Sequence, residues 1–206
     1  MTPKIKSGTY LYTMNDVEVV REPWRIESHK DGRRTVTSSR ISETFGIQID
    51  LIALETKDVS KYDFTFTDLN AGKPVACGFY KVEPEGVVFR STEFGEWEPV
   101  SCASYFFPLM RIFTGALVRQ VISMGGQADI IVPDIRNPAN TETLFKPLKS
   151  RREVNADPTQ ENLFHYLGGH YETAVPVTLN DDGLMMHYTW TTPDGAKWIC
   201  QNCIQS

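Results

Sequence analysis

The sequence lacks any apolar run as long as the roughly 18 residues that a helix needs to cross a bilayer, and its N-terminus has no apolar stretch typical of a signal peptide. We therefore expect a cytoplasmic protein with no membrane partner. Basic residues form no stripe, and the net charge is −5. Because phosphate backbones are bound by clustered cations, a nucleic-acid partner is not expected. The densest basic runs, Lys30 to Arg34 and Lys146 to Arg152, are predicted to be solvated surface.

Cysteine is also scarce, with four residues in 206. So few thiols in a chain of this size favour reduced cysteines over a disulfide scaffold. Cys200 and Cys203 have the spacing of half a zinc site or of a redox pair, but Cys77 and Cys102 form no second pair of this kind. We predict thiols near the core, and we expect neither a metal nor a cofactor.

The usual catalytic signatures are missing as well. The chain has no G-x-S-x-G elbow, no P-loop, and no G-x-G-x-x-G after a strand. The common sequence evidence for a hydrolase, a nucleotide site or a dinucleotide site is therefore absent.

What the chain does contain is period-two alternation of apolar and polar residues. With 41% hydrophobic and 23% charged residues, no internal repeat and no linker, it is predicted to form a single domain over residues 1–206. Turn residues separate the alternating segments at intervals typical of consecutive antiparallel hairpins. The expected strands are Thr9 to Thr13, Val17 to Ser28, Arg33 to Phe45, Gly46 to Glu55, Tyr62 to Leu69, Pro74 to Val82, Gly86 to Ser91, Trp97 to Cys102, Gln127 to Ile135, and segments within 144–154, 162–173, 184–191 and 197–204.

One segment differs, because Tyr105 to Met124 is apolar almost throughout and ends at Gly125 and Gly126. This run predicts a single long helix that starts near Pro108. The fold class is thus mainly β, with a strongly curved antiparallel sheet, a half-barrel or open barrel, wrapping one long apolar helix. Such an arrangement tends to leave a lined cavity, and its exposed sheet edges would permit a homodimer.

Two stretches carry a family resemblance: the opening hairpin GTYLYTMNDVEVVREPWRI with its HKDGRR turn, and the step RIFTGALVRQVISMGGQADIIVPDI. They resemble the bacterial glycolipid-binding and lipoprotein-carrier-like fold group, in which an antiparallel half-barrel wraps a long apolar helix. The resemblance implies that fold and a hydrophobic ligand, and it carries over no functional residue.

Asp50 is the first candidate site residue. It interrupts GIQIDLIALE, a segment whose two faces are both mostly apolar, which predicts a central strand covered on both sides. A carboxylate there needs a partner, and Arg111 or Arg119 on the charged stripe of the helix is the expected one. In this hypothesis either Asp50 or His165 removes a proton while Arg111 holds an anionic or carbonyl group.

His165 and His170 flank Gly168 and Gly169. A glycine bulge would bring both imidazoles to one face, as an acid/base or metal pair, whereas the alternative is two rim histidines beside Tyr166. Tyr188 is expected to donate a hydrogen bond to developing oxyanion charge. The remaining predicted substrate-binding residues are Arg119, Glu22, Trp24, Tyr166 and His170.

These candidates favour a cofactor-independent enzyme, of lyase or isomerase type, acting on an apolar or aromatic small molecule between the helix and the concave sheet. The alternative is a non-catalytic carrier or sensor of a lipid-like ligand. A carrier pocket would be lined almost wholly by apolar side chains, whereas an enzyme pocket would gather titratable groups.

Overall fold

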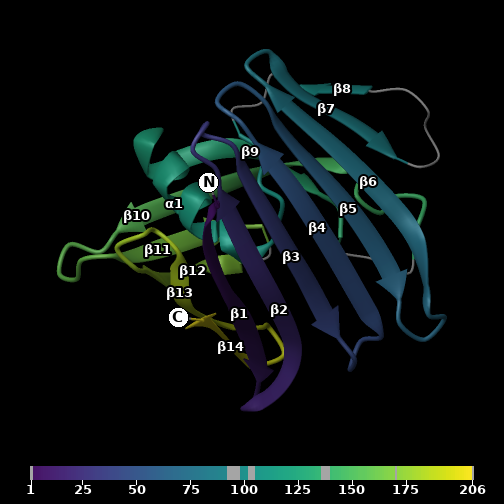
Figure 1. Cartoon of the computed structure of the whole chain (residues 1–206). Coiled ribbons are helices and arrows are strands. Elements are labelled where there is room, and N and C mark those ends of the chain that lie inside the picture. Colours follow the sequence, from purple (N-terminus) through teal and green to yellow (C-terminus); the bar gives the residue numbers. More distant parts are fainter. Residues whose placement is uncertain (1, 92–97, 102–104, 136–139, 170, 206) are drawn as a thin grey trace.

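Fourteen strands and one short helical segment make up the described part of the chain (Figure 1). The computed structural model describes residues 2–91, 98–101, 105–135, 140–169 and 171–205. The strands are β1 (Lys4–Met14), β2 (Val17–Ser28), β3 (Arg34–Ser42), β4 (Ile47–Glu55), β5 (Ser60–Asp68), β6 (Lys73–Glu83), β7 (Gly86–Ser91), β8 (Glu98–Ser101), β9 (Gln127–Pro133), β10 (Pro147–Ala156), β11 (Leu163–Gly168), β12 (Tyr171–Leu179), β13 (Met185–Thr191) and β14 (Lys197–Gln205). The helical segment consists of the 3₁₀ turn η1 (Arg111–Phe113) and the α-helix α1 (Thr114–Ser123).

All fourteen strands belong to one sheet, ordered β8-β7-β6-β5-β4-β3-β2-β1-β14-β13-β12-β11-β10-β9. Every pairing between strands is antiparallel, and Thr9 opposite Cys203 joins the first strand to the last. The sheet therefore runs as two meanders that meet at the paired terminal strands, and it stays open between β8 and β9. The predicted mainly β fold with an open antiparallel sheet is confirmed at this level. Asn15 and Asp16 both have positive φ, as a type I′ hairpin turn requires, and the predicted turn there is confirmed.

The prediction of a long helix is wrong. α1 has only ten residues, and the apolar segment before it, Tyr105–Met110, is not helical. This segment, here called the strap, lies along the edge of β9, where Phe106 pairs with Ile131. The N–H of Phe107 donates to the carbonyl of Ile131 at 2.8 Å. A residue that precedes proline is biased away from helical geometry, and Pro108 has no N–H for a helix interior, so the apolar character of the strap reflects burial rather than helicity.

The strap and the helical segment pack between the two ends of the open sheet. The ring of Phe106 stacks on Tyr80 of β6 with centroids 4.3 Å apart, and Phe113 meets the edge of Tyr62 of β5 at 5.9 Å. Leu117 and Val121 of α1 are fully buried, and α1 lies beside β9 and β10 (Figure 1). Apolar burial between these elements holds the two meanders around one core.

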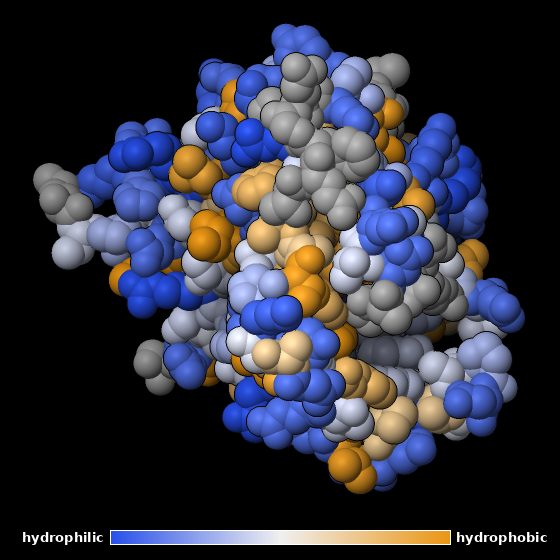
Figure 2. All heavy atoms as spheres, turned by 90° about the vertical axis from the view of Figure 1, so that its right-hand side faces the viewer, coloured by the Kyte–Doolittle hydropathy of each residue, from blue (hydrophilic) through white to orange (hydrophobic). Residues whose placement is uncertain are grey.

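The outer face of the sheet is solvated, which corrects the expectation for β4. Ile49, Leu51 and Ala53 are buried on the inner face, but Ile52 is 54% and Leu54 is 39% exposed. β4 is therefore covered on one side only. Figure 2 shows one outer face of the molecule, mostly hydrophilic with apolar side chains in a broken band across its middle. Among the described residues, no helix has the length and apolarity needed to cross a membrane.

Candidate functional site

A charged residue occupies the inner face of β2. The period-two pattern turns Val20, Glu22, Trp24 and Ile26 inward, as the sequence predicts, and the side chain of Glu22 is fully buried. A buried carboxylate is tolerated only when it is hydrogen-bonded or paired with a cation.

Four groups from three elements, β1, β3 and η1, satisfy Glu22. The hydroxyl of Tyr12 donates to Oε2 at 2.6 Å, and that of Ser38 donates to Oε1 at 3.2 Å. Arg40 Nε donates to Oε2 at 2.9 Å. The backbone N–H of Arg111, the first residue of η1, donates to Oε1 at 2.6 Å. Glu22 thus ties β1, β2 and β3 to the start of the helical segment, whose first N–H groups have no partner within the helix.

Arg40 links this buried carboxylate to the strap. Its side chain is 15% exposed, and besides pairing with Glu22 it donates from Nη2 to the carbonyl of Leu109 at 2.5 Å. Leu109 has φ +60, a left-handed conformation that is unfavourable for a bulky residue. Burial lowers the pKa of Arg40, but the neighbouring Tyr12 and Glu22 outweigh this effect and raise it above its ordinary value. Arg40 therefore remains charged and helps to hold the end of the strap.

Arg111 has a different environment, because its side chain lies among aromatic rings. Its guanidinium is 4.8 Å from the ring centroid of Tyr188, 5.8 Å from that of Tyr12 and 5.9 Å from that of Trp190. Its Nε is buried and has no hydrogen-bond partner in the described structure. Cation–π contacts hold the group in place, but no carboxylate of a described residue pairs with it.

Arg152 of β10 is 3% exposed, which contradicts the prediction that the basic run 146–152 is entirely solvated. It donates to the hydroxyl of Ser150 and to the carbonyl of Arg151 at 2.9 Å, and its guanidinium lies 5.9 Å from the ring centroid of Tyr166. Its Nε has no partner in the described structure, and no described carboxylate pairs with it. Arg151, one position earlier, points outward, since alternate residues of a strand face opposite sides.

These three arginines line one cavity of about 260 Å³, here called the arginine pocket. Glu22 compensates the charge of Arg40, whereas the charges of Arg111 and Arg152 meet no carboxylate among the described residues. The described lining of the cavity is thus positive. Its lining residues are Arg40, Phe107, Leu109, Arg111, Ile135, Arg152, Tyr166, Gly168, Gly169 and Tyr171.

Two glycines keep the pocket open beside Arg152. The expected strand with a glycine bulge is wrong, because β11 ends at Gly168 and the antiparallel β12 begins at Tyr171, with Gly168 paired to Tyr171. Gly168 and Gly169, at this chain reversal, have φ +117 and +72. A Cβ on Gly169 would lie 3.0 Å from Arg152 Nη2, and a Cβ on Gly168 would overlap the carbonyl of Arg151. Larger residues at these positions would crowd the guanidinium and strain the backbone.

The phenols and the thiol around the pocket have pKa values raised well above neutral pH. Burial raises the pKa of Tyr166 to about 12, although the positive charge of Arg152 acts in the opposite direction. Burial also raises the pKa of Tyr188 and of Tyr12. The pKa of the buried Cys200 thiol rises to about 12 for the same reason. These phenols and this thiol therefore stay protonated near pH 7, where the phenols can donate hydrogen bonds but are poor proton acceptors.

Several of the residues predicted from the sequence gather here. Arg111 and Tyr166 line the pocket, Tyr188 packs on Arg111, and Glu22 lies next to Arg40. Trp24 is buried on the same inner face, where its Nε1 donates to Asn202 at 3.0 Å. The proposed roles of these residues stay predictions.

Other predicted residues lie elsewhere. Asp50 is on the outer side of β4 and accepts from Ser39 Oγ at 2.5 Å, so the expected pairing with Arg111 or Arg119 is wrong. Arg119 is exposed and borders a separate cavity. His165 neighbours the inward Tyr166 on β11 and bonds to Asp157. His170 lies outside the described residues, and the catalytic roles of Asp50 and His165 remain predictions.

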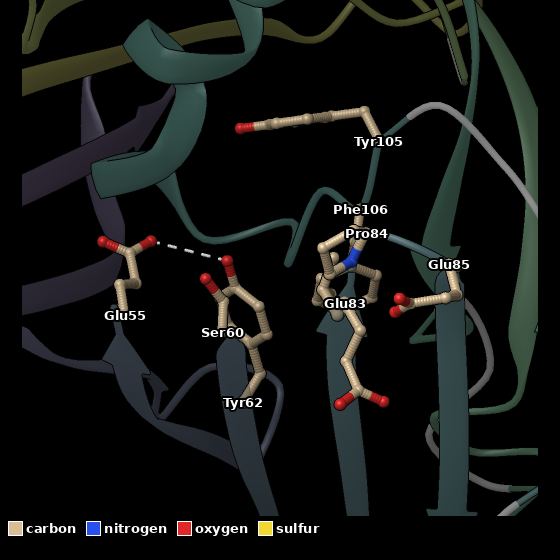
Figure 3. Close-up of a pocket in the computed structure, with 10 residues that line it drawn as sticks. Glu55, Ser60, Tyr62, Glu83, Pro84, Glu85, Tyr105 and Phe106 are labelled. Atoms are coloured by element: carbon tan, nitrogen blue, oxygen red, sulfur yellow. Dashed lines mark hydrogen bonds between the residues drawn. The ribbon is translucent and has the colours of Figure 1, made fainter. Parts of the chain in front are cut away.

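A larger cavity, of about 520 Å³, lies where β4, β5 and β6 meet the start of the strap (Figure 3). Its acidic residues are mostly engaged: Glu55 pairs with Arg34 at 3.0 Å, and Glu83 pairs with Lys81 at 2.7 Å. Tyr62 Oη donates to Glu55 at 3.4 Å. This cavity therefore shows ordinary ion pairs rather than the uncompensated buried charge of the arginine pocket.

Asp157 offers a test of the turn between β10 and β11, because its side chain joins this turn to His165 of β11. It accepts from the Thr159 hydroxyl at 2.6 Å and from the Thr159 N–H at 2.8 Å, and it contacts His165 Nε2 at 2.8 Å. These hydrogen bonds, first that of the Thr159 hydroxyl and then that of His165, lower the pKa of Asp157 below its usual 3.8. Because the folded pKa is the lower one, the stabilisation is present above about pH 4 and is lost as the pH falls through the folded pKa. Asp157→Asn should therefore lower the urea midpoint at pH 7 but not at the acid limit, and an equal difference at both pH values would contradict this assignment.

Comparison with known proteins supports the fold alone. No family model and no curated protein matches the chain. Among solved structures, the chain is similar to a crystal structure described as a beta-barrel-like protein of domain of unknown function DUF1849 from Brucella abortus, with TM-score 0.56, 8% identity and coverage of 100% of both chains. A likeness at this identity establishes a beta-barrel-like fold group, which is coarser than the lipid-carrier resemblance of the sequence. Among the described residues, no group of three histidine, cysteine, aspartate or glutamate residues is placed to hold a metal ion.

Proposed function

We propose that this protein binds a small amphipathic anion in the arginine pocket. The observation that carries the proposal is a pair of arginines, the buried Arg152 and the partly buried Arg111, that border a cavity and have no described carboxylate partner; the Nε atoms of both are buried. A buried charge is costly unless an opposite charge compensates it. An anionic ligand would supply that charge, and the apolar part of the ligand would contact Phe107, Leu109 and Ile135.

The lining favours a carrier or sensor over an enzyme. The described lining residues include no carboxylate and no imidazole that could serve as a general base. Guanidinium groups and neutral phenols bind and orient a ligand but exchange protons poorly near pH 7. The lyase or isomerase predicted from the sequence, the cytoplasmic location and the homodimer stay predictions.

Arg152→Gln, with Arg151→Gln as its matched control, tests the proposal. The probes are octyl phosphate, octan-1-ol and octylamine, which share one alkyl chain but differ in charge. Binding can be followed by tryptophan fluorescence, because Trp190 contacts Arg111. We expect the wild type to bind the anion in preference to the alcohol and the amine.

Loss of the Arg152 guanidinium should weaken anion binding about tenfold to a hundredfold, the range for a charge-assisted hydrogen bond. Arg151→Gln should bind as the wild type does, because that side chain faces outward. Equal losses in the two variants, or equal binding of octylamine, would show that the pocket is not the anion site.

A further inference from the structure

The charge balance of the arginine pocket points to a doubly charged head group. We infer that the ligand carries a phosphomonoester dianion on an apolar substituent; this inference rests on the proposed function and specifies its ligand.

The first argument is the number of uncompensated charges. Arg40 is already engaged, since it pairs with Glu22 at 2.9 Å and donates to the carbonyl of Leu109. Arg111 and Arg152 both lack a described carboxylate partner. A monoanion would leave one of these two cations uncompensated, whereas a dianion balances both.

The second argument concerns hydrogen-bond donors. Arg111 Nε and Arg152 Nε are both buried without a partner in the described structure. A phosphomonoester presents three terminal oxygens and suits guanidinium forks, whereas a carboxylate presents two oxygens in one plane. Arg111 approaches from η1 and Arg152 from β10. The three oxygens of a phosphomonoester, which do not lie in one plane with the phosphorus, match two such donors better than a planar carboxylate does. The neutral phenol of Tyr166 lies on the same lining and is a further possible donor for the head group.

The third argument is size. A cavity of about 260 Å³ is smaller than the 300–1,000 Å³ that is typical of complete ligand sites, so it fits a head group and the first atoms of a substituent. Phe107, Leu109 and Ile135 supply an apolar wall for those atoms. A soluble alkyl or aryl phosphate and a lipid with a phosphomonoester head group share this chemistry.

The experiment compares octyl phosphate, methyl octyl phosphate and octanoate at about pH 8, where the monoester is doubly charged and the other two carry a single charge. Calorimetric titration of the wild type should give at least tenfold tighter binding for octyl phosphate than for either monoanion. Arg152→Gln should remove most of that preference, while Arg151→Gln should retain it. Unfolding midpoints of both variants show whether each is folded at the titration temperature.

Vesicles of phosphatidylcholine with and without phosphatidic acid distinguish the two sources of the head group. Cosedimentation that depends on phosphatidic acid and on Arg152 identifies a lipid ligand, and binding of octyl phosphate without cosedimentation identifies a soluble one. If a monoanion binds as tightly as octyl phosphate, the dianion inference is overturned but the proposed function stands. If the wild type binds none of the three probes, or if Arg151→Gln loses as much affinity as Arg152→Gln, both fail.

Discussion

Glu22→Gln is expected to lower the free energy of unfolding by about 3–5 kcal/mol, the typical cost of removing one partner of a buried ion pair. Glutamine keeps the shape of the side chain but has no charge, so Arg40 is left in the interior without a carboxylate. The amide also offers only one acceptor oxygen to the donors that now meet two, among them Tyr12 and the N–H of Arg111. Urea unfolding at pH 7 measures the change.

Glu18→Gln is the matched control. Glu18 belongs to the same strand, but its pair with Arg21 is exposed, so its loss should change stability by no more than about 0.5 kcal/mol. Equal losses in the two variants would mean that Glu22 is solvated and does not anchor the pocket.

Gly115→Ala should lower the free energy of unfolding by about 3 kcal/mol or more. In an exposed helix this substitution stabilises by roughly 0.5–1 kcal/mol, since alanine is the better helix former. Gly115 is buried where α1 crosses the turn before β13, and a methyl group there would overlap the backbone carbonyl of Gly183. Neither backbone can move without displacing its own element, so overpacking dominates.

Ala116→Gly tests intrinsic helix propensity one residue away. Ala116 is exposed, and glycine there should cost about 1 kcal/mol. If Gly115→Ala raises the urea midpoint, α1 does not pack against the Gly183 turn as described.

The sheet could be predicted because period-two alternation and turn residues act locally. Asn15 and Asp16 form the expected hairpin turn. The segment expected as a strand with a glycine bulge is instead two antiparallel strands, with Gly168 paired to Tyr171. The prediction of a long helix was wrong because an apolar run indicates burial but does not specify backbone geometry. In Tyr105–Met110, the geometry is set by Pro108 and by the edge of β9, a partner that follows later in the chain.

The site was predictable only in part. Glu22 and Arg111 stand out as charges within apolar patterns, and both lie at the pocket. Asp50 stands out in the same way but faces solvent, because sequence cannot tell an outer face that carries exposed Ile52 and Leu54 from a covered one. Arg152 was missed since it follows Arg151 in a basic run, and alternation alone does not say which of the two turns inward. Arg40 joins the site through Glu22 and the strap, contacts that depend on how the sheet curves.

The most direct test of the central claim is a crystal structure of the protein grown with 4-bromophenyl phosphate, with data collected at the bromine absorption edge. We predict phosphate oxygens within hydrogen-bond distance of the Arg111 and Arg152 guanidinium groups, and an anomalous bromine peak beside Phe107, Leu109 and Ile135. A peak in the acidic cavity of Figure 3, or beside Arg119, with no phosphate in the arginine pocket, would contradict the claim.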